Sequence, residues 1–417
     1  NLMSYRKIQK CRLCNSKKLK KIFNFSKTAV GNNLLKKNEI KLNYKSKYPL
    51  HVNQCSDCGH HQLSISVDNK ILYAKNYTYL TGISNIFKNY LNDYSIKISK
   101  NLNIQKKDLV LEIGSNDGTL LKCFKTNVGC NVLGIDPSIE PTKVAKKNKI
   151  RVIKSFFSFD LAKSIKKKYK TPKLITTHNT FAHVEDVEDF FKGINHLCDE
   201  NTHIVIEIGY WLEVMKNYWF DTIYHEHHDY YSLKPLVKFF HKFNYNIKNF
   251  KITKPQGGSL MLFLKKSKKR IIYKNVLNQI QIEKKFGLYN LSKYKKINNN
   301  ILKIRKIFNN QLKLYKNKKL KIHAYGSPTK AVTLLSFLKI PKNIIEMIYE
   351  DNILKCNLYN PYQNIPIVHS SKIYQNKPDV IIILAWNFYK SIAIKIKNNY
   401  KDKMILIVPL PKPFIIK

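Results

Sequence analysis

Arginine is the residue that this chain most lacks. Only five arginines stand among 75 lysine and arginine residues, and 27 acidic residues leave a net charge of +48. Such a charge is typical of proteins that bind nucleic acids or anionic membranes. Arginine, however, is the residue that contacts guanine and phosphate in a bidentate fashion, so its scarcity argues against a dedicated nucleic-acid surface. The lysine, asparagine, isoleucine and tyrosine in which the chain is rich all have AT-rich codons, which accounts for the charge without a polyanionic partner.

Long apolar runs are also missing. The longest apolar stretches, such as residues 380–386, fall far short of the ~18–20 residues that cross a bilayer, so no membrane insertion is expected. The first residues hold no apolar segment of the kind found in secretory signals. Eight cysteines in 417 residues are too few for a disulfide scaffold. We therefore expect a cytoplasmic protein that is a monomer or a weak dimer.

The length predicts two or three domains. Residues 1–75 carry two cysteine pairs, residues 76–265 alternate strand-like and helix-like segments, and residues 266–417 repeat that alternation after a long polar helix predicted over 270–318. Such alternation predicts mostly parallel sheets, so the fold class is α/β with a small N-terminal domain. A helix is predicted over 85–102. Strands are predicted near 108–114, 131–136, 174–178, 203–208, 321–326, 344–350, 379–384 and 404–408.

Four cysteines form two Cys-x-x-Cys pairs, Cys11 with Cys14 and Cys55 with Cys58. Each pair can present two thiolates to one ion, so the two pairs together suit a tetrahedral zinc site. Four thiolates leave no open coordination position, which favours a structural role. His60 and His61 follow the second pair and could replace a ligand, but we expect them on the surface.

A strand is predicted to end, and a helix to begin, within the segment Glu112-Ile-Gly114-Ser-Asn-Asp117-Gly. A glycine there lets the backbone approach a ligand, and a helix N-terminus favours electronegative groups. Asp136 closes the next predicted strand, where an acid binds ribose hydroxyls in nucleoside-binding sheets. The two features together are typical of methyltransferases that use S-adenosylmethionine (SAM). The alternative is an ordinary turn with a capping aspartate.

The densest group of titratable residues is Tyr224-His225-Glu226-His227-His228. An imidazole beside a carboxylate can act as a general base near neutral pH. A helix would place Tyr224 and His227 on one face, and His-Glu-His could also resemble a metal site. From the residues alone, surface histidines and catalysis are equally good interpretations.

Taken in order, the motifs resemble the SAM-dependent sugar C-methyltransferases, which act on nucleotide-linked 4-keto-deoxysugars. The resemblance covers almost the whole chain. Its motifs are the two cysteine pairs, Tyr77-x-Tyr79, the segment 111–118, Asn179-Thr-Phe-Ala-His183, the segment 221–227, the segment 257–260, Gly326-Ser-Pro-Thr-Lys330, Glu350-Asp-Asn352, the segment 365–367 and Ala385-Trp-Asn387.

This resemblance implies an N-terminal zinc-binding domain, a central Rossmann-like SAM domain and a C-terminal Rossmann-like domain that helps to hold a nucleotide sugar. It implies two cofactors, SAM and a structural Zn²⁺, and no nucleic-acid partner. The base would be His227, and the other catalytic residues would be Tyr79, His183, Tyr224 and Glu226. The cofactor would contact Glu112, Gly114, Asn116, Asp117, Asp136 and Asn179. The substrate would contact Gln256, Gly257, Ser259, Lys330, Glu350, Asn352, Lys355, Trp386 and Asn387.

Several residues depart from the family pattern. Gln256 and Met261 replace a histidine and an arginine, Asn357 and Tyr362 stand where glycines are expected, and Ala331-Val332 replaces Gly-Asn. The SAM and Tyr-x-Glu-His motifs are intact, so we expect methyl transfer to a sugar or nucleotide unlike the antibiotic-type substrates, with loss of activity as a lesser possibility. Two other functions stay open: an O- or N-methyltransferase, and a zinc-ribbon protein that binds nucleic acid.

Overall fold

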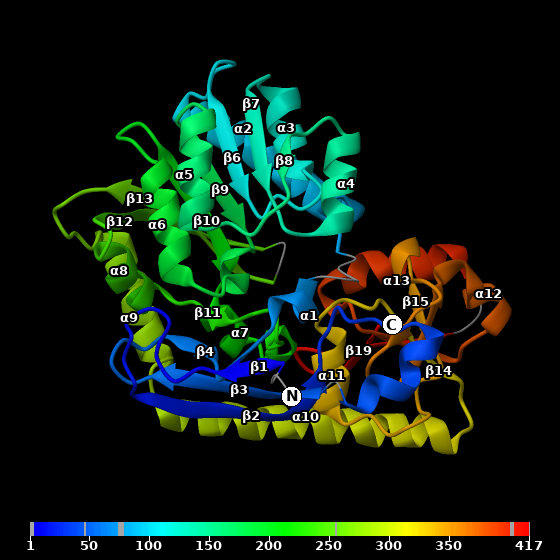
Figure 1. Cartoon of the computed structure of the whole chain (residues 1–417). Coiled ribbons are helices and arrows are strands. Elements are labelled where there is room, and N and C mark those ends of the chain that lie inside the picture. Colours follow the sequence, from blue (N-terminus) through cyan, green and yellow to red (C-terminus); the bar gives the residue numbers. More distant parts are fainter. Residues whose placement is uncertain (1–3, 46, 74–78, 255–256, 401–403, 417) are drawn as a thin grey trace.

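The computed structural model of this chain describes residues 4–45, 47–73, 79–254, 257–400 and 404–416. Figure 1 shows three bodies. A large α/β body lies above an N-terminal sheet and a C-terminal α/β body, which lie side by side. Helix α10 (Leu291–Asn317) runs along the base beneath both of the lower bodies.

The central body is built on a twisted, mostly parallel sheet. Its strands lie in the order β12 (Tyr245–Thr253), β13 (Ser259–Lys266), β10 (His203–Gly209), β9 (Leu174–His178), β6 (Leu109–Ile113), β7 (Asn131–Ile135) and β8 (Val152–Ile153). All pairings from β10 to β8 are parallel, whereas β13 is antiparallel to both of its neighbours. The strand order reverses between β6 and β9, and ligands of such sheets bind at the carboxyl ends of the strands at that point.

Helices cover both faces of the central sheet. One face carries α2 (Asn85–Leu102), α3 (Thr119–Asn127) and α4 (Ile139–Lys147), and the other carries α5 (Phe159–Lys168), α6 (Val187–Leu197) and α8 (Leu233–His241). The predicted helix over 85–102 is confirmed by α2. Met261, where the family has an arginine, is 5% exposed in the core beneath α2 and α3, so this departure alters the core and not a ligand site.

The C-terminal body repeats the same design. Its strands lie in the order β16 (Tyr359–Asn360), β17 (Ile365–His369), β15 (Ile348–Glu350), β14 (Ile322–Tyr325), β18 (Val380–Ile383), β19 (Ile405–Val408) and β20 (Phe414–Ile416), accompanied by helices α11 (Ala331–Leu338), α12 (Ile373–Asn376) and α13 (Tyr389–Asn399). The pairings from β17 to β19 are parallel, and the order reverses between β14 and β18. The prediction of an α/β fold with a second Rossmann-like domain is confirmed.

The N-terminal body is made mainly of antiparallel strands. Strand β1 (Tyr5–Lys7) pairs with β5 (Ile65–Val67), and a second sheet has the order β11 (Asp229–Tyr230), β4 (His61–Leu63), β3 (Lys47–Cys55) and β2 (Leu19–Ala29). The sequence pattern assigned residues 229–230 to the central domain. The structure instead makes them the edge strand of the N-terminal sheet, directly after the Tyr-His-Glu-His-His segment.

Short elements lie within and between these bodies. They are the helices α1 (Asn69–Tyr73) and α7 (Trp211–Lys216) and the 3₁₀ turns η1 (Lys37–Lys45), η2 (Thr81–Ile83), η3 (Phe181–His183), η4 (Phe220–Thr222), η5 (Ile353–Lys355), η6 (Ser370–Lys372) and η7 (Trp386–Phe388). Many of the candidate site residues lie on them.

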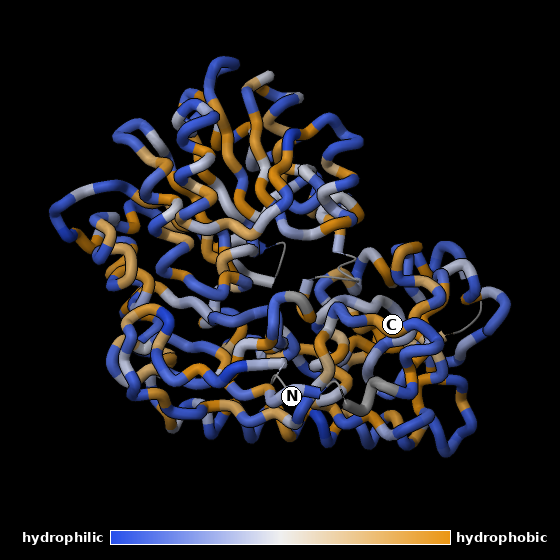
Figure 2. The backbone as a smooth tube through the Cα atoms, viewed as in Figure 1, coloured by the Kyte–Doolittle hydropathy of each residue, from blue (hydrophilic) through white to orange (hydrophobic). Residues whose placement is uncertain are grey.

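The single long helix predicted over 270–318 is wrong. The segment forms two helices, α9 (Lys274–Phe286) and α10, because Gly287 adopts a left-handed φ of 84° and ends α9. Helix α10 buries one apolar stripe against β2 and α11. Figure 2 shows the same partition across the molecule, with apolar segments along the strands and hydrophilic loops at the outer rim. In the described part of the chain, no helix combines the length and the apolar character needed to cross a membrane.

Tyr294 of α10 joins all three bodies through its hydroxyl. The hydroxyl donates to the Leu288 carbonyl at 2.7 Å, accepts from Trp211 Nε1 at 3.0 Å and lies 2.7 Å from His61 Nε2. We expect Tyr294→Phe to lower the free energy of unfolding by about 1–3 kcal/mol, because it leaves these buried partners unsatisfied. Urea unfolding measures the change. Tyr315→Phe on the same helix loses only a bond from Gln311 and should change stability by less than about 0.5 kcal/mol; equal effects of the two substitutions would contradict the prediction.

Candidate active site

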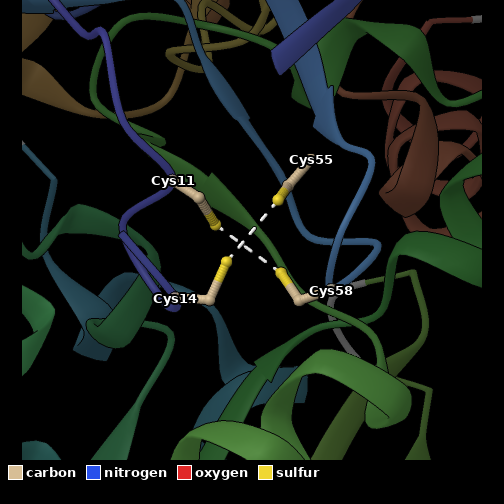
Figure 3. Close-up of side chains that lie close together, drawn as sticks. All are labelled: Cys11, Cys14, Cys55 and Cys58. Atoms are coloured by element: carbon tan, nitrogen blue, oxygen red, sulfur yellow. Dashed lines mark hydrogen bonds between the residues drawn. The ribbon is translucent and has the colours of Figure 1, made fainter. Parts of the chain in front are cut away.

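The four cysteines converge on one point. The sulfurs of Cys11 and Cys58 lie 3.6 Å apart, as do those of Cys14 and Cys55, and all four lie within 4.8 Å of one another. Figure 3 shows the side chains pointing toward a common centre. A tetrahedral Zn²⁺ with bonds of about 2.3 Å requires sulfur–sulfur distances near 3.8 Å, so the geometry fits a closed Cys₄ site.

Metal binding requires these thiols to lose their protons. The hydrogen bond with Cys58 and burial raise the pKa of Cys11, and burial raises the pKa of Cys14 to about 12, whereas hydrogen bonds outweigh burial and lower the pKa of Cys55. The expected structural zinc site is confirmed by this arrangement.

His60 and His61 are not on the surface, contrary to expectation. Both side chains are fully buried. His60 Nε2 lies 2.7 Å from Asp229 Oδ1, and His61 Nε2 lies 2.7 Å from the Tyr294 hydroxyl. Each histidine therefore connects the metal-binding body to another part of the chain and does not serve as a ligand.

The segment after β6 forms a tight loop at the point where the strand order reverses. Gly114 has a φ of 80°, and a Cβ there would lie 1.9 Å from Thr180 Oγ1. The Asp136 carboxylate accepts hydrogen bonds from the backbone N–H groups of Asn116 and Ser138, both at 2.8 Å. The predicted residues of this motif are therefore brought together at the carboxyl edge of the sheet.

Glu112 suits a cationic ligand. Its side chain is 4% exposed, and its Oε2 atom has no hydrogen-bond partner among the described residues. Burial, together with repulsion from Asp117 and Asp136, raises the pKa of Glu112 well above its ordinary value. SAM carries a sulfonium and an ammonium group, so a buried carboxylate at this edge fits its charge. Asn179 follows β9 at the same edge with a left-handed φ of 54°.

Asn116 and Asp117 hold a neighbouring segment in place. Asn116 Oδ1 accepts from the Thr81 N–H at 2.9 Å, its Nδ2 donates to the Tyr79 carbonyl at 3.1 Å, and Asp117 Oδ2 accepts from the Gly82 N–H at 2.7 Å. These bonds tie the predicted tyrosine Tyr79, 39% exposed, to the loop of the SAM motif. Tyr77 lies outside the described residues.

A cavity of about 690 Å³ opens next to this motif. It begins at the residues that follow Asp136, and it lies between the central body and the N-terminal body. Its lining includes Tyr73, Pro137, Ile139 and Phe156. The volume is within the range of small-molecule and cofactor sites.

Tyr224 and His227 form a hydrogen-bonded pair in a turn, and not on a helix. The His227 N–H donates to the Tyr224 carbonyl at 3.0 Å, and the Tyr224 hydroxyl lies 2.7 Å from His227 Nε2. His227 Nδ1 lies 2.9 Å from the Thr222 carbonyl, which can only accept, so Nδ1 carries the proton and Nε2 carries the lone pair. Burial, followed by the charges of His183 and Lys330, keeps the pKa of His227 well below its usual value. The imidazole is therefore neutral and basic at Nε2.

His183 packs against the pair formed by Tyr224 and His227. Its ring packs at right angles on that of His227, with centroids 4.8 Å apart, and its Nδ1 lies 3.0 Å from the Tyr73 hydroxyl. Burial lowers the pKa of His183 to about 4, so this ring is neutral too. Among the described residues, the only group with the spacing of a metal site is the cysteine cluster, so the histidines do not form a second one.

Glu226 faces away from His227, toward the N-terminal body. Its Oε1 accepts from the Asn32 N–H at 3.2 Å, and Asn32 Oδ1 accepts from the Thr329 hydroxyl at 2.7 Å. Burial raises the pKa of Glu226 to about 7. Glu226 is next to His227 in the sequence, but its carboxyl group contacts Asn32, and it is Asn32 that contacts the C-terminal body.

Lys330 of the C-terminal body lies next to Asp221, in the segment that leads to His227. Its Nζ lies 3.8 Å from the centre of the Trp386 ring and 3.9 Å from Asp221 Oδ2. Trp386 Nε1 donates to the same Asp221 oxygen at 2.6 Å, and the Trp386 ring lies 5.3 Å from that of Trp219. Asp221 and Trp219 were not predicted as site residues. Asp221 stands in a motif noted above, but its partner is 165 residues away, and no local pattern reveals such a contact.

The other C-terminal candidates lie where that sheet reverses its strand order. Glu350 accepts hydrogen bonds from the N–H groups of Ser327 and Asn352, and Lys355 Nζ donates to the Ser327 carbonyl at 2.8 Å. These groups therefore hold the loop that leads to Lys330. Asn387 lies beside Trp386 in η7.

Two further residues depart from the family pattern. The backbone conformation explains one of them, and nothing in the structure explains the other. Asn357 adopts a φ of 66°, which asparagine tolerates better than most residues, so the expected glycine is not required. The Tyr362 hydroxyl donates to the Ile340 carbonyl at 2.7 Å, and nothing in the structure relates it to the site.

The hairpin between β12 and β13 approaches the same region. A Cβ on Gly257 would lie 3.2 Å from the Trp219 ring, and Ser259 is buried at the start of β13. Gln256 lies outside the described residues. This hairpin and the Lys330 loop therefore meet at the two tryptophans.

Family comparisons identify the chain along nearly its whole length. Residues 11–73 match the family described as "Putative zinc binding domain", residues 88–249 match a methyltransferase domain, and residues 254–411 match the C-methyltransferase C-terminal domain. The C-methyltransferase NovU of Streptomyces niveus is 24% identical over 412 residues, which are 99% of this chain and 97% of that protein.

Two solved methyltransferase structures are similar to part of this chain. A SAM-dependent methyltransferase from Clostridium acetobutylicum is 15% identical with a TM-score of 0.34, over 43% of this chain and 92% of that one. The magnesium protoporphyrin IX methyltransferase of Synechocystis, with bound S-adenosylhomocysteine, is 12% identical with a TM-score of 0.34, over 44% of this chain and 88% of that one. The family domains and the curated relative show that the chain is a SAM-dependent methyltransferase, and they support the C-methyltransferase family.

Gly114→Ala should abolish most SAM binding. The new Cβ clashes with Thr180 and the left-handed φ disfavours alanine, so the loop has to move. We expect at least a tenfold weaker affinity, or about 1.4 kcal/mol, by titration calorimetry with SAM. The matched control is Gly209→Ala, whose Cβ meets nothing within 4 Å. Unchanged affinity in Gly114→Ala would show that SAM does not use this loop.

Zinc removal should disorder the N-terminal body. We expect Cys58→Ser to bind less than the one Zn²⁺ per chain of the wild type and to expose the segment around residues 55–63 to limited proteolysis, because metal binding contributes directly to folding in such sites. Metal content by atomic absorption and the cleavage sites by mass spectrometry measure this. Cys356→Ser, which removes a thiol in the C-terminal body, is the control. Full zinc content in Cys58→Ser would contradict the four-cysteine site.

Proposed function

We propose that this enzyme methylates the carbon next to the ketone of a nucleotide-linked 4-keto-deoxysugar. The observation that supports the proposal is the tautomer of His227: Nδ1 donates to the Thr222 carbonyl, so Nε2 carries the lone pair and faces the Tyr224 hydroxyl. A carbon next to a ketone is acidic enough for such a base to deprotonate. The similarity to C-methyltransferases favours carbon over oxygen or nitrogen as the acceptor.

The chain's own residues supply the proton transfer. Nε2 of His227 takes the proton from the carbon, and the electron pair of the C–H bond moves onto the keto oxygen to give an enolate. The Tyr224 hydroxyl occupies Nε2 in the structure, so the substrate has to displace it. Once displaced, this hydroxyl can donate to the enolate oxygen, and donors placed at developing negative charge are a main source of catalysis. SAM, when bound, supplies an electrophilic methyl group to the enolate carbon.

The nucleotide sugar would bind between the central and C-terminal bodies. The edge where the C-terminal sheet reverses its order is the place where such sheets bind ligands, and Lys330, Trp386 and Asn387 lie there. The paired rings of Trp219 and Trp386 offer a flat apolar surface beside the ammonium group of Lys330. An aromatic surface beside a cation suits a sugar or base attached to a diphosphate.

SAM would use the carboxyl edge of the central sheet. Asp136 would hold the ribose hydroxyls, Glu112 would face the cationic part, and Gly114 would let the backbone approach. These SAM residues match the family. Gln256, where the family has a histidine, is the one departure at a residue expected to contact the substrate, so we expect a sugar or nucleotide different from the antibiotic-type substrates.

His227→Ala should abolish exchange of the substrate's carbon-bound proton with solvent. With dTDP-, UDP- and GDP-linked 4-keto-6-deoxyhexoses in D₂O, and S-adenosylhomocysteine present, we expect deuterium incorporation by mass spectrometry to fall about 10²- to 10⁴-fold, because the general base is lost. Calorimetry should show unchanged SAM affinity. His196→Ala, at a half-buried position on α6 whose ring packs on Phe159, should behave like the wild type.

The pH dependence follows from the lowered pKa of His227. The imidazole is already deprotonated at its ordinary value of 6.5, so the exchange rate should stay level as the pH rises from 6.5 to 8 and fall only in more acidic buffer. A rate that climbs steeply through pH 6.5 to 7 would contradict this environment for the base.

A further inference from the structure

Arg12 is a buried arginine inside the first cysteine pair. It stands between Cys11 and Cys14, and its side chain is 6% exposed. Its backbone N–H donates to Gln62 Oε1 at 2.9 Å, so the turn that carries it is attached to strand β4. Neither zinc coordination nor the proposed proton transfer gives this side chain a role.

The guanidinium of Arg12 contacts the two chain segments that carry the catalytic histidines. Its Nη1 donates to the Glu185 carbonyl, two residues after His183, and its Nε lies 3.8 Å from Asp229 Oδ1, two residues after His227. One side chain of the metal-binding turn therefore reaches both segments. In each segment, the residue that it contacts is two positions after the histidine. The fixed planar fork of arginine suits such a double contact.

The two histidine segments depend on outside support. His183 ends a 3₁₀ turn of three residues, and His227 precedes the two-residue strand β11. Elements this short do not hold their own conformation. The His228 N–H donates to the Ala182 carbonyl at 2.7 Å, so the segments are linked to each other, and the T-shaped packing of the two rings depends on how this linked unit is placed.

Neighbouring residues hold Asp229 and the turn that carries Arg12 in place. Asp229 Oδ1 also contacts His60 Nε2 at 2.7 Å, and the His60 N–H lies 3.4 Å from Cys58 Sγ, so the second cysteine pair holds the acid that Arg12 approaches. The Leu13 carbonyl, next to Arg12, accepts from Lys242 Nζ of the central body. The metal-binding turns are therefore attached to the central body at the histidine segments.

We propose that Arg12 is a positioning residue that sets the placement of His183 and His227 relative to each other and to the metal-binding turns. This rests on the proposed function only in so far as His227 is the base. On this view the Cys₄ site supports the reaction at a distance, because the ion fixes the turn from which Arg12 reaches the histidine segments.

The chain offers a matched control in Arg6. Its guanidinium also contacts Glu185, but through the carboxylate, at 2.9 Å on the surface, where its own side chain is 59% exposed. An exposed ion pair of this kind contributes little to stability. Arg6→Met thus removes the same residue type from the same partner without disturbing the carbonyl contact or Asp229.

The test compares Arg12→Met, Arg12→Lys and Arg6→Met with the full-length wild-type enzyme. The measurements are kcat and KM on the 4-keto sugar panel, SAM affinity by calorimetry, zinc content, and the imidazole signals of ¹⁵N-histidine-labelled protein by NMR. His183→Ala and His227→Ala assign those signals.

We expect Arg12→Met to keep one zinc per chain and its SAM affinity, to shift the His183 and His227 signals, and to lower kcat about 100-fold. KM should change less than about threefold, because ground-state binding is not affected. Arg12→Lys keeps the charge but cannot contact both partners at once, so it should shift the same signals. Arg6→Met should match the wild type in zinc content and in the His183 and His227 signals.

Two results would overturn the proposal. One is unchanged histidine signals in both Arg12 variants. The other is loss of zinc in both Arg12 variants, which would show that Arg12 is needed only for metal binding. A wild-type enzyme that turns over none of the 4-keto sugars would instead contradict the proposed substrate, and the histidine signals would still decide the role of Arg12.

Discussion

The pairing of β11 with β4 is the contact on which the active site depends. It joins only Asp229 and Tyr230 to Gln62 and His61, yet it brings the end of the histidine segment into the sheet that carries the second cysteine pair. A two-residue strand cannot hold itself in place. Its position is fixed by buried partners on its flank, above all the contact between His60 and Asp229, and by the ion-binding turns behind them. The His227 segment and the cysteine cluster are therefore held against each other by one sheet.

Much of the scaffold could be predicted because it is encoded locally. Each βα unit shows an apolar run, a loop and a helix start within about 20 residues, and for this reason α2 and the strands β6, β7, β9, β10, β14, β18 and β19 were found near their true bounds. The Cys-x-x-Cys spacing also predicts metal binding from only four neighbouring residues at a time. The break at Gly287 was missed because the polar pattern continues on both sides of it, although the glycine itself was a signal.

The assembled site could not be predicted, because its contacts join distant parts of the chain. The sequence showed that Tyr224 and His227 are close, but the tautomer of His227 depends on a carbonyl contact that only the fold defines. His60 and His61 are expected on the surface from the sequence, because their buried partners Asp229 and Tyr294 are far away along the chain. The same holds for Asp221, which meets Lys330 and Trp386 from another body. Motif resemblance gave the residues, and the structure gave their partners.

The edge strand β11 also has a consequence for the order in which the enzyme folds. The chain must release residues 229 and 230 from the ribosome before β4, made some 165 residues earlier, can receive its last neighbour. Pairings so distant in sequence form late, because closing a long loop is entropically costly and slows folding. The α/β units, built from local contacts, can condense before that. The parallel strands β6 to β10 precede residues 229 and 230 in the chain, so they can pair before the N-terminal sheet receives its edge strand.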